Sequence, residues 1–344
     1  MDAQKLAAAI REQAQWCQRL GSPLYHSLLE RMATDVESSG VVWKVLQPFS
    51  GDPGRSLLPL RFLAGLHRLA LEGCLPDLAR CYPSAGGSAN PEAAFAALLN
   101  ALEHNAGQVR DNLPPGVQTN EVSRCAALLP GFLEIGRSTG LPLRLLEIGC
   151  SAGLNLRWDH YRYDTSRGPL GDPNSPVVFD SPFVGDPPAN VPVAVVERRG
   201  CDLNPIDPTT GEGRLTLLSF VWPDQTARFQ LLAKAIEMAR IVPSTLDRAN
   251  AVEWLEAQLA RPRNGAATVV FHSIVLLYLS NGDRQRVEQL LARAGEQATK
   301  DAPLAWLSME PGEDQTDVRL TLWPSGERKR IATAGYHGRP VSLL

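Results

Sequence analysis

From Leu143 onward, short apolar runs alternate with segments of helical apolar spacing, and this alternation constrains the fold more than any other feature of the chain. The strand-like runs occupy 143–149, 193–202, 241–250, 267–273 and 302–310. Helical spacing separates the later runs, at 225–240, 252–259 and 283–297. Because strands that alternate with helices build a parallel sheet through right-handed crossovers, the sequence predicts an α/β domain.

Two stretches depart from this alternation. In 318–335 a Pro-Ser-Gly turn separates two strand-like runs, which predicts an antiparallel hairpin at the end of a mostly parallel sheet. The stretch 157–190 is rich in Pro, Gly and Asp and fits neither a helix nor a strand. We expect it to be a long ordered loop or lid, inserted about 157–190.

The N-terminal third of the chain carries helical spacing only, as with Leu6 and Ile10. A turn-rich segment, DNLPPG at 111–116, follows these helices. The sequence therefore predicts an all-helical N-terminal domain over 1–115 and an α/β domain over 116–344.

Composition narrows the classes of partner. The 344 residues carry a net charge of −3 and a pI of about 6.1, which argues against a general nucleic-acid binder. Six cysteines form no Cys-x-x-Cys pair, so neither a zinc ribbon nor another metal centre is expected. Their scatter is typical of reduced thiols in a cytosolic protein.

The N-terminal segment MDAQKLAAAIREQAQ lacks the basic start and apolar block of a secretory signal. The longest apolar stretch, 268–279, is too short to cross a bilayer. We expect a cytoplasmic protein outside the membrane. The sequence does not determine its oligomeric state.

The run 145–156, LLEIGCSAGLNL, leads from an apolar strand through a turn of small residues into a predicted helix. Gly149 lets the backbone turn sharply after the strand, and Gly153 permits close contact between helix and strand. Such a turn lies outside the carboxyl end of a strand, where open α/β sheets bind ligands. The run predicts a site for a nucleotide-like ligand, although a plain strand-to-helix turn would need the same glycines.

The same residues resemble motif I of the class I S-adenosylmethionine (SAM)-dependent methyltransferases, which reads acid-x-Gly-x-Gly-x-Gly. Glu147, Gly149 and Gly153 match this motif, and Ser151 stands where the middle glycine is usual. The resemblance implies a Rossmann-like SAM-binding sheet, with Glu147 arranging the loop or meeting the amino group of SAM. The residues implied under the methionine part of SAM are Glu147, Gly149, Cys150, Ser151, Ala152 and Gly153.

A dinucleotide site is the rival interpretation of this run. Its Gly-x-Gly-x-x-Gly pattern needs a third glycine at position 154, where the chain has Leu154. The second glycine is also missing, so the close approach of a pyrophosphate is less favoured.

An acid at the end of the second strand can accept hydrogen bonds from both ribose hydroxyls of SAM, because a carboxylate offers two acceptor oxygens to a vicinal diol. Asp202 is the first choice, with Leu203 beside it, and Glu197 is the second. Asp202 lies 49 positions after Gly153, whereas about 20 is usual in Rossmann units, so the stretch 157–190 must be an insertion. The alternative is that Asp202 forms only an Asx-type turn.

Further candidates follow the later strands. Asn250, with Ala251 after it, is placed to meet the adenine amino group through its carbonyl oxygen, or else to cap the next helix. His272 follows the fourth strand and is the candidate base, since an imidazole titrates near neutral pH. Its alternatives are a ring that stacks near adenine and a satisfied core histidine. Glu310, at the end of the fifth strand, is a second catalytic acid or base.

The chain as a whole, from about Gln15 to the C-terminus, is identified as a member of a narrower bacterial family, domain of unknown function 2332. The segments that carry the resemblance are 21–25 (GSPLY), 118–124 (QTNEVSR), 145–156, 198–207 (RRGCDLNPID), 220–228 (FVWPDQTAR) and 271–279 (FHSIVLLYL). Membership implies a SAM-type fold and no established reaction.

Three functions are compatible with these patterns. The first is a SAM-dependent methyltransferase that acts on a small molecule. The chain lacks the Asn-Pro-Pro-Tyr run that often follows the fourth strand in enzymes that methylate nucleic-acid amines. The second is a non-catalytic module or sensor that binds SAM or another adenosine ligand, and the third is a purely structural Rossmann domain.

Overall fold

The computed structural model describes residues 2–51, 56–114 and 116–344. The chain forms two compact units: Met1–Thr119 with Thr210–Ala233, and Asn120–Thr209 with Lys234–Leu344. The boundary expected from the sequence falls at residue 115, which lies outside the described residues. The sequence also placed 210–233 in the α/β domain, whereas this segment belongs to the helical unit.

The first unit is helical and its core is formed by the apolar faces of its helices. In α1, for example, Leu6 and Ile10 are buried, as their spacing predicts. The elements are α1 (Ala3–Arg19), α2 (Pro23–Glu37), α3 (Val41–Leu46), η1 (Gln47–Phe49), α4 (Leu58–Leu71), α5 (Pro76–Ala79), η3 (Pro83–Ala85), α6 (Pro91–Asp111), α8 (Gly211–Ser219) and the first turns of α9 (Thr226–Ile241).

Asp224 explains why a late segment belongs to this unit. One carboxylate oxygen accepts from Ser22 Oγ at 2.6 Å, and the other accepts from the backbone N of Leu24 at 3.0 Å. Asp224 thereby joins Ser22 in capping the first turn of α2. Gln225 Nε2 also donates to the carbonyl oxygen of Leu20 at 2.7 Å, and Trp222 packs in the helical core. Apolar spacing carries no information about such a distant cap, so the sequence did not predict it.

The second unit is built on one large sheet with the strand order β5-β12-β11-β10-β9-β8-β1-β6-β7. Its strands are β1 (Leu143–Ile148), β5 (Phe183–Val184), β6 (Val195–Asp202), β7 (Thr245–Arg248), β8 (Ala267–Ser273), β9 (Leu304–Pro311), β10 (Thr316–Trp323), β11 (Glu327–Ala334) and β12 (Val341–Leu343). Strands β7, β6, β1, β8 and β9 run parallel, and β10 and β11 form an antiparallel hairpin. The predicted α/β class, mostly parallel sheet and C-terminal hairpin are confirmed.

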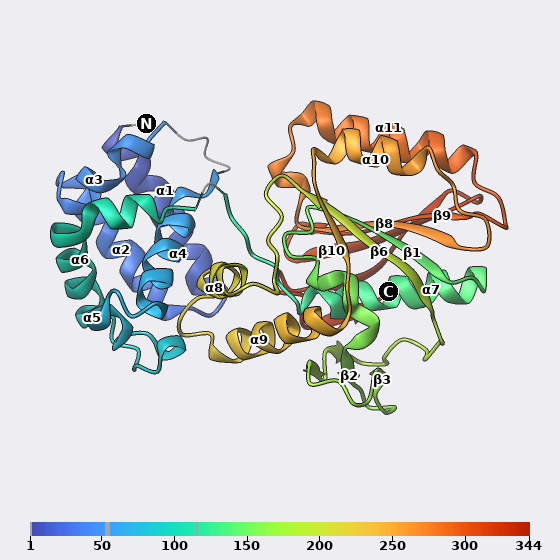
Figure 1. Ribbon diagram of the computed structural model, residues 1–344, viewed down its shortest axis with the longest axis horizontal. Coiled ribbons are helices and arrows are strands. Elements are labelled where there is room, and N and C mark those ends of the chain that lie inside the picture. Colours follow the sequence, from blue (N-terminus) through green and yellow to red (C-terminus); the bar gives the residue numbers. More distant parts are fainter. Residues whose placement is uncertain (1, 52–55, 115) are drawn as a thin grey trace. The chain divides into compact units, whose positions relative to one another are not determined.

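Helices cover both faces of this sheet (Figure 1). α7 (Arg124–Thr139) lies on one face, and α10 (Ala251–Leu259) and α11 (Asn281–Glu296) lie on the other. β1 and β8 are therefore buried at every position, as central strands of a parallel sheet usually are. Phe271 of β8 meets Phe132 of α7 with ring centroids 5.2 Å apart. Because side chains alternate along a strand, His272 faces the α10 and α11 layer.

The α-helix predicted after Gly153 is wrong, because the chain forms only a short 3₁₀ segment, η4 (Leu154–His160). Arg157 gives the physical reason. Its Nη1 donates to the carbonyl oxygen of Gly153 at 2.6 Å, and its Nε donates to that of Val242 at 2.7 Å. In an α-helix the Gly153 carbonyl would accept from the Arg157 backbone N–H, so the side chain replaces the bond that would continue the helix.

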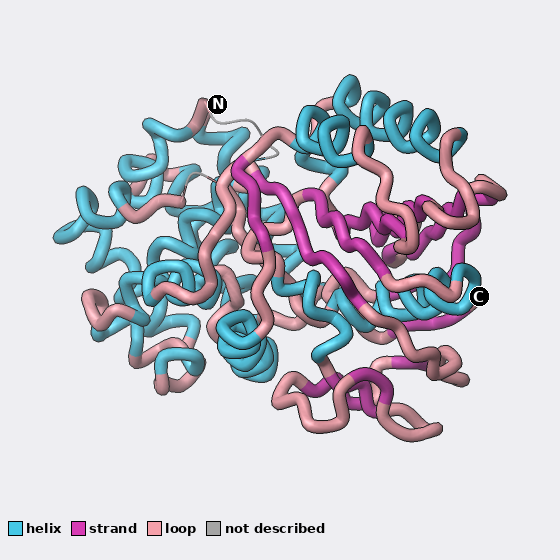
Figure 2. The backbone as a smooth tube through the Cα atoms, turned by 45° about the vertical axis from the view of Figure 1, so that its right-hand side comes forward, coloured by secondary structure: helices cyan, strands magenta, loops and turns pink. Residues whose placement is uncertain are grey.

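The stretch 157–190 is more regular than a loop. It contains β2 (Arg162–Asp164), β3 (Leu170–Gly171) and β4 (Val178–Asp180), which form a small sheet, and β5, which pairs with β12. Figure 2 shows the small sheet of β2, β3 and β4 set apart from the main sheet. Tyr161, Tyr163 and Phe179 fill a small core beneath them and are almost fully buried. These aromatic residues fix the insertion in place.

Within the described ranges, none of the helices has the length and apolar character needed to span a bilayer. The same residues contain no grouping of three or more His, Cys, Asp or Glu side chains suited to a metal ion. All six cysteines are free thiols, and only Cys74 is exposed.

Candidate functional site

The carboxyl ends of β1, β6, β8 and β9 meet at one edge of the sheet, because these strands are parallel and in register. Glu147 of β1 pairs with Gly200 of β6 and Phe271 of β8, and His272 pairs with Ser308 of β9. The residues that follow these strands are those in which the sequence predicted a site. We call this region the carboxyl edge.

The turn after β1 folds back through alternate residues with positive φ: +65° at Gly149, +51° at Ser151 and +64° at Gly153. Glycine adopts this conformation freely, but serine does so only at a cost. A side chain at Gly149 would meet Val275, and one at Gly153 would meet Leu246. The glycines are therefore required by close packing as well as by the turn.

The small residues of the turn are largely enclosed. Cys150 and Ala152 have no exposed surface, and Ser151 is 6% exposed. Cys150 packs against Gly200 of the neighbouring strand, and burial raises the pKa of its thiol well above the ordinary value. Its side chain therefore points into the protein, so only its backbone is positioned to serve a ligand.

Asp202, at the end of β6, faces this turn. Its Oδ2 accepts from the backbone N of Ser151 at 3.0 Å, and its Oδ1 accepts from that of Asn204 at 2.8 Å. Ile206 N in turn donates to the carbonyl oxygen of Ser151 at 3.0 Å. The Asx-type turn that the sequence left open is therefore present, and the same carboxylate also fixes the turn after β1. A carboxylate has about four acceptor positions, of which these bonds use two.

Glu147 is 2% exposed and its Oε2 has no hydrogen-bond partner. Burial raises the pKa of this carboxyl well above its ordinary value, and the Asn155 hydrogen bond and the charge of Arg157 lower it by less. Burial therefore favours the uncharged form of Glu147. Arranging the loop, one of the two roles that the resemblance implies for Glu147, fits this buried position.

Two residues of the segment 118–124 belong to the carboxyl edge, although the sequence predicted no site there. Asn120 lies shortly before α7, and its Oδ1 accepts from the backbone N of Ala152 at 3.3 Å and of Leu154 at 3.0 Å. Arg124 Nη1 donates to the carbonyl oxygen of Ser273, after β8, at 2.9 Å. Their only signal in the sequence was that they lie in a segment shared with the family.

The expected adenine contacts lie beyond Asp202. Leu203, the residue after Asp202, is 66% exposed. Asn250 is exposed and caps α10, because its Oδ1 accepts from the backbone N of Val252 at 2.8 Å. The carbonyl oxygen that was expected to meet adenine is thus used by the helix, while Ala251 is the first residue of α10. The amino end of the Asn250 amide faces away from that bond.

His272 is a buried histidine whose two nitrogens both have partners. Trp306 Nε1 approaches its Nε2 at 3.0 Å, and Glu310 Oε1 lies 2.7 Å from its Nδ1. Because an indole N–H can only donate, Nε2 must accept, and the ring proton must lie on Nδ1. The ring has no lone pair with which to take a proton from a substrate. The expected base is thus the satisfied core histidine that the sequence left as an alternative.

Glu310 ends β9 at the same edge. Its Oε1 accepts from His272 and from the backbone N of Val275 at 2.9 Å and of Leu276 at 3.3 Å. Burial raises the pKa of the carboxyl, whereas the hydrogen bonds from His272, Val275 and Leu276 lower it and favour the ionised form. Glu310 is therefore ionised at neutral pH.

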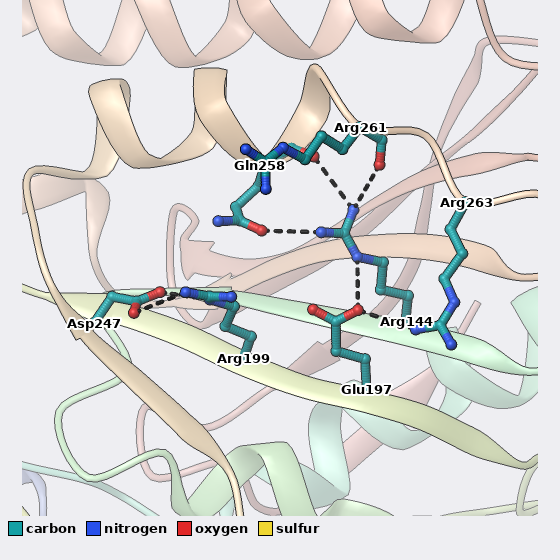
Figure 3. Close-up of polar contacts among 7 residues, drawn as sticks. All are labelled: Arg144, Glu197, Arg199, Asp247, Gln258, Arg261 and Arg263. Atoms are coloured by element: carbon teal, nitrogen blue, oxygen red, sulfur yellow. Dashed lines mark hydrogen bonds and ion pairs between the residues drawn. The ribbon is translucent and has the colours of Figure 1, made fainter.

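Glu197, the second choice for the ribose acid, lies at the opposite end of β6 (Figure 3). Its Oε2 accepts from Arg144 Nε at 3.0 Å and pairs with Arg263 at 3.1 Å. Arg144 also donates to the carbonyl oxygens of Gln258 and Arg261, which end α10. This cluster fastens a helix to the sheet and takes no part in the carboxyl edge.

Comparison with known proteins identifies the family to which the chain belongs. No curated protein and no solved structure matches the chain. The family described as "Uncharacterized protein conserved in bacteria" (DUF2332) matches residues 7–343, which include the whole carboxyl edge. The chain therefore belongs to this bacterial family.

Proposed function

We propose that this protein is a SAM-dependent methyltransferase that acts on a small molecule. The observation that carries the proposal is the hydrogen bond between Ser151 N and Asp202 Oδ2, at 3.0 Å. It places a carboxylate from the end of β6 beside the bent backbone that follows β1. A site for an adenosyl amino acid needs both features: an acceptor for the ribose hydroxyls and a backbone that the ligand can approach closely.

The strand order supports the same location. From β1 the chain continues to β6 and β7 on one side, and it then crosses to β8 and β9 on the other side. In open α/β sheets, ligands bind outside the carboxyl ends of the strands where the order reverses in this way. Here the reversal lies between β1 and β8, next to the turn at 149–153.

The chain's own groups suggest how SAM would lie. Asp202 would accept the ribose hydroxyls with its remaining acceptor positions, and Leu203 would cover the adenine ring. The amino end of Asn250 would donate to a ring nitrogen. Arg124 would face the carboxylate of the methionine part. Val275 packs against Gly149, so its side chain must turn away from a ligand on the turn.

When bound, SAM would supply a methyl group on a positively charged sulfur. The protein's contribution would then be alignment and exclusion of water, which account for much of the rate enhancement in such transfers. Asn120, Asp202 and Ile206 hold the turn rigid through its backbone, as an aligned transfer requires.

Calorimetry with SAM tests the proposal. We expect the full chain to bind SAM, and Asp202→Ala to weaken binding roughly 10- to 100-fold, because charge-assisted hydrogen bonds contribute about 1.5–3 kcal/mol each. Asp180→Ala, which removes an exposed acid of β4 whose carboxylate accepts from Ser181 Oγ, is the matched control and should bind like wild type. If wild type shows no binding at hundreds of micromolar, or if Asp202→Ala binds equally well, the proposal is wrong.

A SAM-binding sensor without transfer is the second candidate. The observation that favours it is His272, because its occupied nitrogens remove the expected base from β8. Incubation with methyl-labelled SAM and a small-molecule extract separates the two functions. Tight binding without any labelled product would favour the sensor, and a labelled small molecule would favour the enzyme.

A further inference from the structure

The carboxylate of Glu310 is bonded on one oxygen only. Oε1 accepts three hydrogen bonds, from His272 and from the backbone of Val275 and Leu276. Oε2 is buried and accepts none from the residues that the structure describes. Burying a carboxylate oxygen without a hydrogen-bond donor costs free energy. A ligand that donates to Oε2 would remove this cost.

The hydrogen-bond donors to Glu310 are also uncharged. His272 is neutral, because its Nε2 accepts from Trp306, and the other two donors are peptide groups. Every hydrogen bond that Glu310 receives from the described residues therefore comes from an uncharged donor. Buried anions in proteins are normally paired with a cation. The missing partner of Oε2 is best supplied by a positively charged donor.

The position of Glu310 relates it to the proposed SAM site. Val275 connects the two, since its side chain packs against Gly149 while its backbone N donates to Glu310. β9 is two strands away from β1, which is roughly 10 Å at the usual strand spacing of about 4.8 Å. Glu310 thus lies past the turn, on the side away from Asp202. A molecule held there would lie next to the methionine end of SAM.

Tyr278 provides an aromatic ring close to this carboxylate. Tyr278 is 40% exposed; burial raises the pKa of its phenol, the positive charge of Arg124 lowers it, and the negative charge of Glu310 raises it. A ring face next to an anion is a favourable place for an organic cation.

We propose that Glu310 binds the ammonium group of a small amine and takes its proton, so that the amine is the methyl acceptor. This inference rests on the proposed function. The ammonium N–H gives its proton to Oε2, and the freed nitrogen lone pair forms the new N–C bond. The C–S bond breaks, its electron pair remains on sulfur, and the proton passes from Glu310 to water.

His272 and Trp306 are positioning residues in this scheme. The indole N–H fixes the histidine tautomer, and the histidine holds Oε1, so the orientation of the whole carboxylate is fixed. Arg328 lies over the Trp306 ring, 4.7 Å from its centroid, and braces the other side of the indole.

Binding of simple ions to the full chain tests the proposal. Calorimetry would compare n-butylammonium with butanol and butanoate, on wild type, Glu310→Gln and Asp317→Asn. Glutamine keeps an oxygen for the three donors, so the fold should be preserved. Asp317 is the matched control, because it lies opposite Glu310 in β10 but is paired with Arg319 and Arg330.

We expect wild type and Asp317→Asn to bind butylammonium at least tenfold more tightly than butanol, and Glu310→Gln to lose this preference. Equal binding of butylammonium and butanol to wild type would overturn the proposal. So would an unchanged preference in Glu310→Gln.

The same variants, titrated with SAM, distinguish this inference from the proposed function. We expect Glu310→Gln to bind SAM like wild type. A parallel loss of SAM affinity would mean that Glu310 holds the ammonium of SAM itself, which overturns the assignment to the acceptor. If wild type binds butylammonium but does not bind SAM, the proposed methyl transfer is wrong, while the assignment of Glu310 as an ammonium-binding residue stands.

The positioning role of His272 has its own readout, the pH at which butylammonium binding is half lost on acidification. His272→Val should raise this pH, because Glu310 loses the donor that lowers its pKa. His272→Asn, which keeps an N–H near the position of Nδ1, should restore it. If both variants keep the wild-type midpoint, His272 does not act through Glu310.

Discussion

At the scale of single residues, the carboxyl edge contains two positions of strained backbone. Ser151 and Ile274 have φ values of +51° and +53°, which cost non-glycine residues of order 1–3 kcal/mol each. They lie after β1 and β8, on either side of the reversal in strand order. Each is held by bonds from its surroundings, Ser151 by Asp202 and Ile274 through the carbonyl oxygen of Met309. Such strain clusters at functional sites, as expected for a ligand-binding turn.

Glu147 gives a prediction at this scale. Its raised pKa means that the folded chain keeps a proton that the unfolded chain loses, so the residue costs stability as pH rises above the ordinary value of 4.5. Glu147→Gln removes this titration while keeping the shape. We expect the melting temperature of the variant, relative to wild type, to be higher at pH 8 than at pH 5. The same difference at both pH values would show that Glu147 is ionised in the fold.

At the scale of elements, polar side chains replace backbone bonds at the ends of helices and strands. Arg157 ends the helix that the motif predicted, and Asn120 satisfies the turn that follows β1. Arg144 has a similar role at the other end of β1 (Figure 3). It donates to the carbonyl oxygens of Gln258 and Arg261, at and just after the end of α10, and it also pairs with Glu197.

Removal of Arg144 tests this account. Its side chain is 7% exposed, so Arg144→Met leaves Glu197 and the end of α10 without a buried partner. We expect a loss of roughly 3 kcal/mol in the free energy of unfolding, measured in urea. Arg263→Ala removes the more exposed partner of the same Glu197 and should cost under about 1 kcal/mol. Equal costs would contradict a special role for the buried arginine.

At the scale of the whole molecule, the helical unit is discontinuous in sequence. His67 of α4 makes this visible, since its ring nitrogens lie 3.0 Å from the carbonyl oxygen of Ser219 and 2.7 Å from Ser84 Oγ. Together with Asp224, it ties the late segment to the early helices. Burial lowers the pKa of His67 to about 4.

A pH dependence follows from His67. The folded chain keeps the ring neutral, whereas the unfolded chain protonates it below its ordinary pKa of 6.5, so stability is lost as pH falls from 6.5 toward 4. Between pH 7.5 and pH 5 the loss from this residue is roughly 2 kcal/mol. Urea unfolding of wild type and His67→Asn at both pH values measures it. The variant should lose less stability on acidification, and equal losses would contradict the assignment.

Much of the fold could be predicted because it depends on local periodicity. The parallel strands and the hairpin follow from alternation and turn residues, which act within a few positions. The turn at Gly149 and Gly153 and the acid at Asp202 were found in the same way. Asn120, Arg124 and the bonds of His272 were missed, because a hydrogen bond between residues far apart in sequence leaves no periodic signal.

The sequence by itself determined the order of strands and helices along the chain, the position of the glycine turn and the membership of a bacterial family. Only the tertiary structure decided which side chains are free to do chemistry. It neutralises Glu147 by burial, occupies both nitrogens of His272 and leaves one oxygen of Glu310 without a donor. The physical reason is that charge and proton affinity depend on what surrounds a group in space, and neighbours in space are set by packing rather than by sequence spacing.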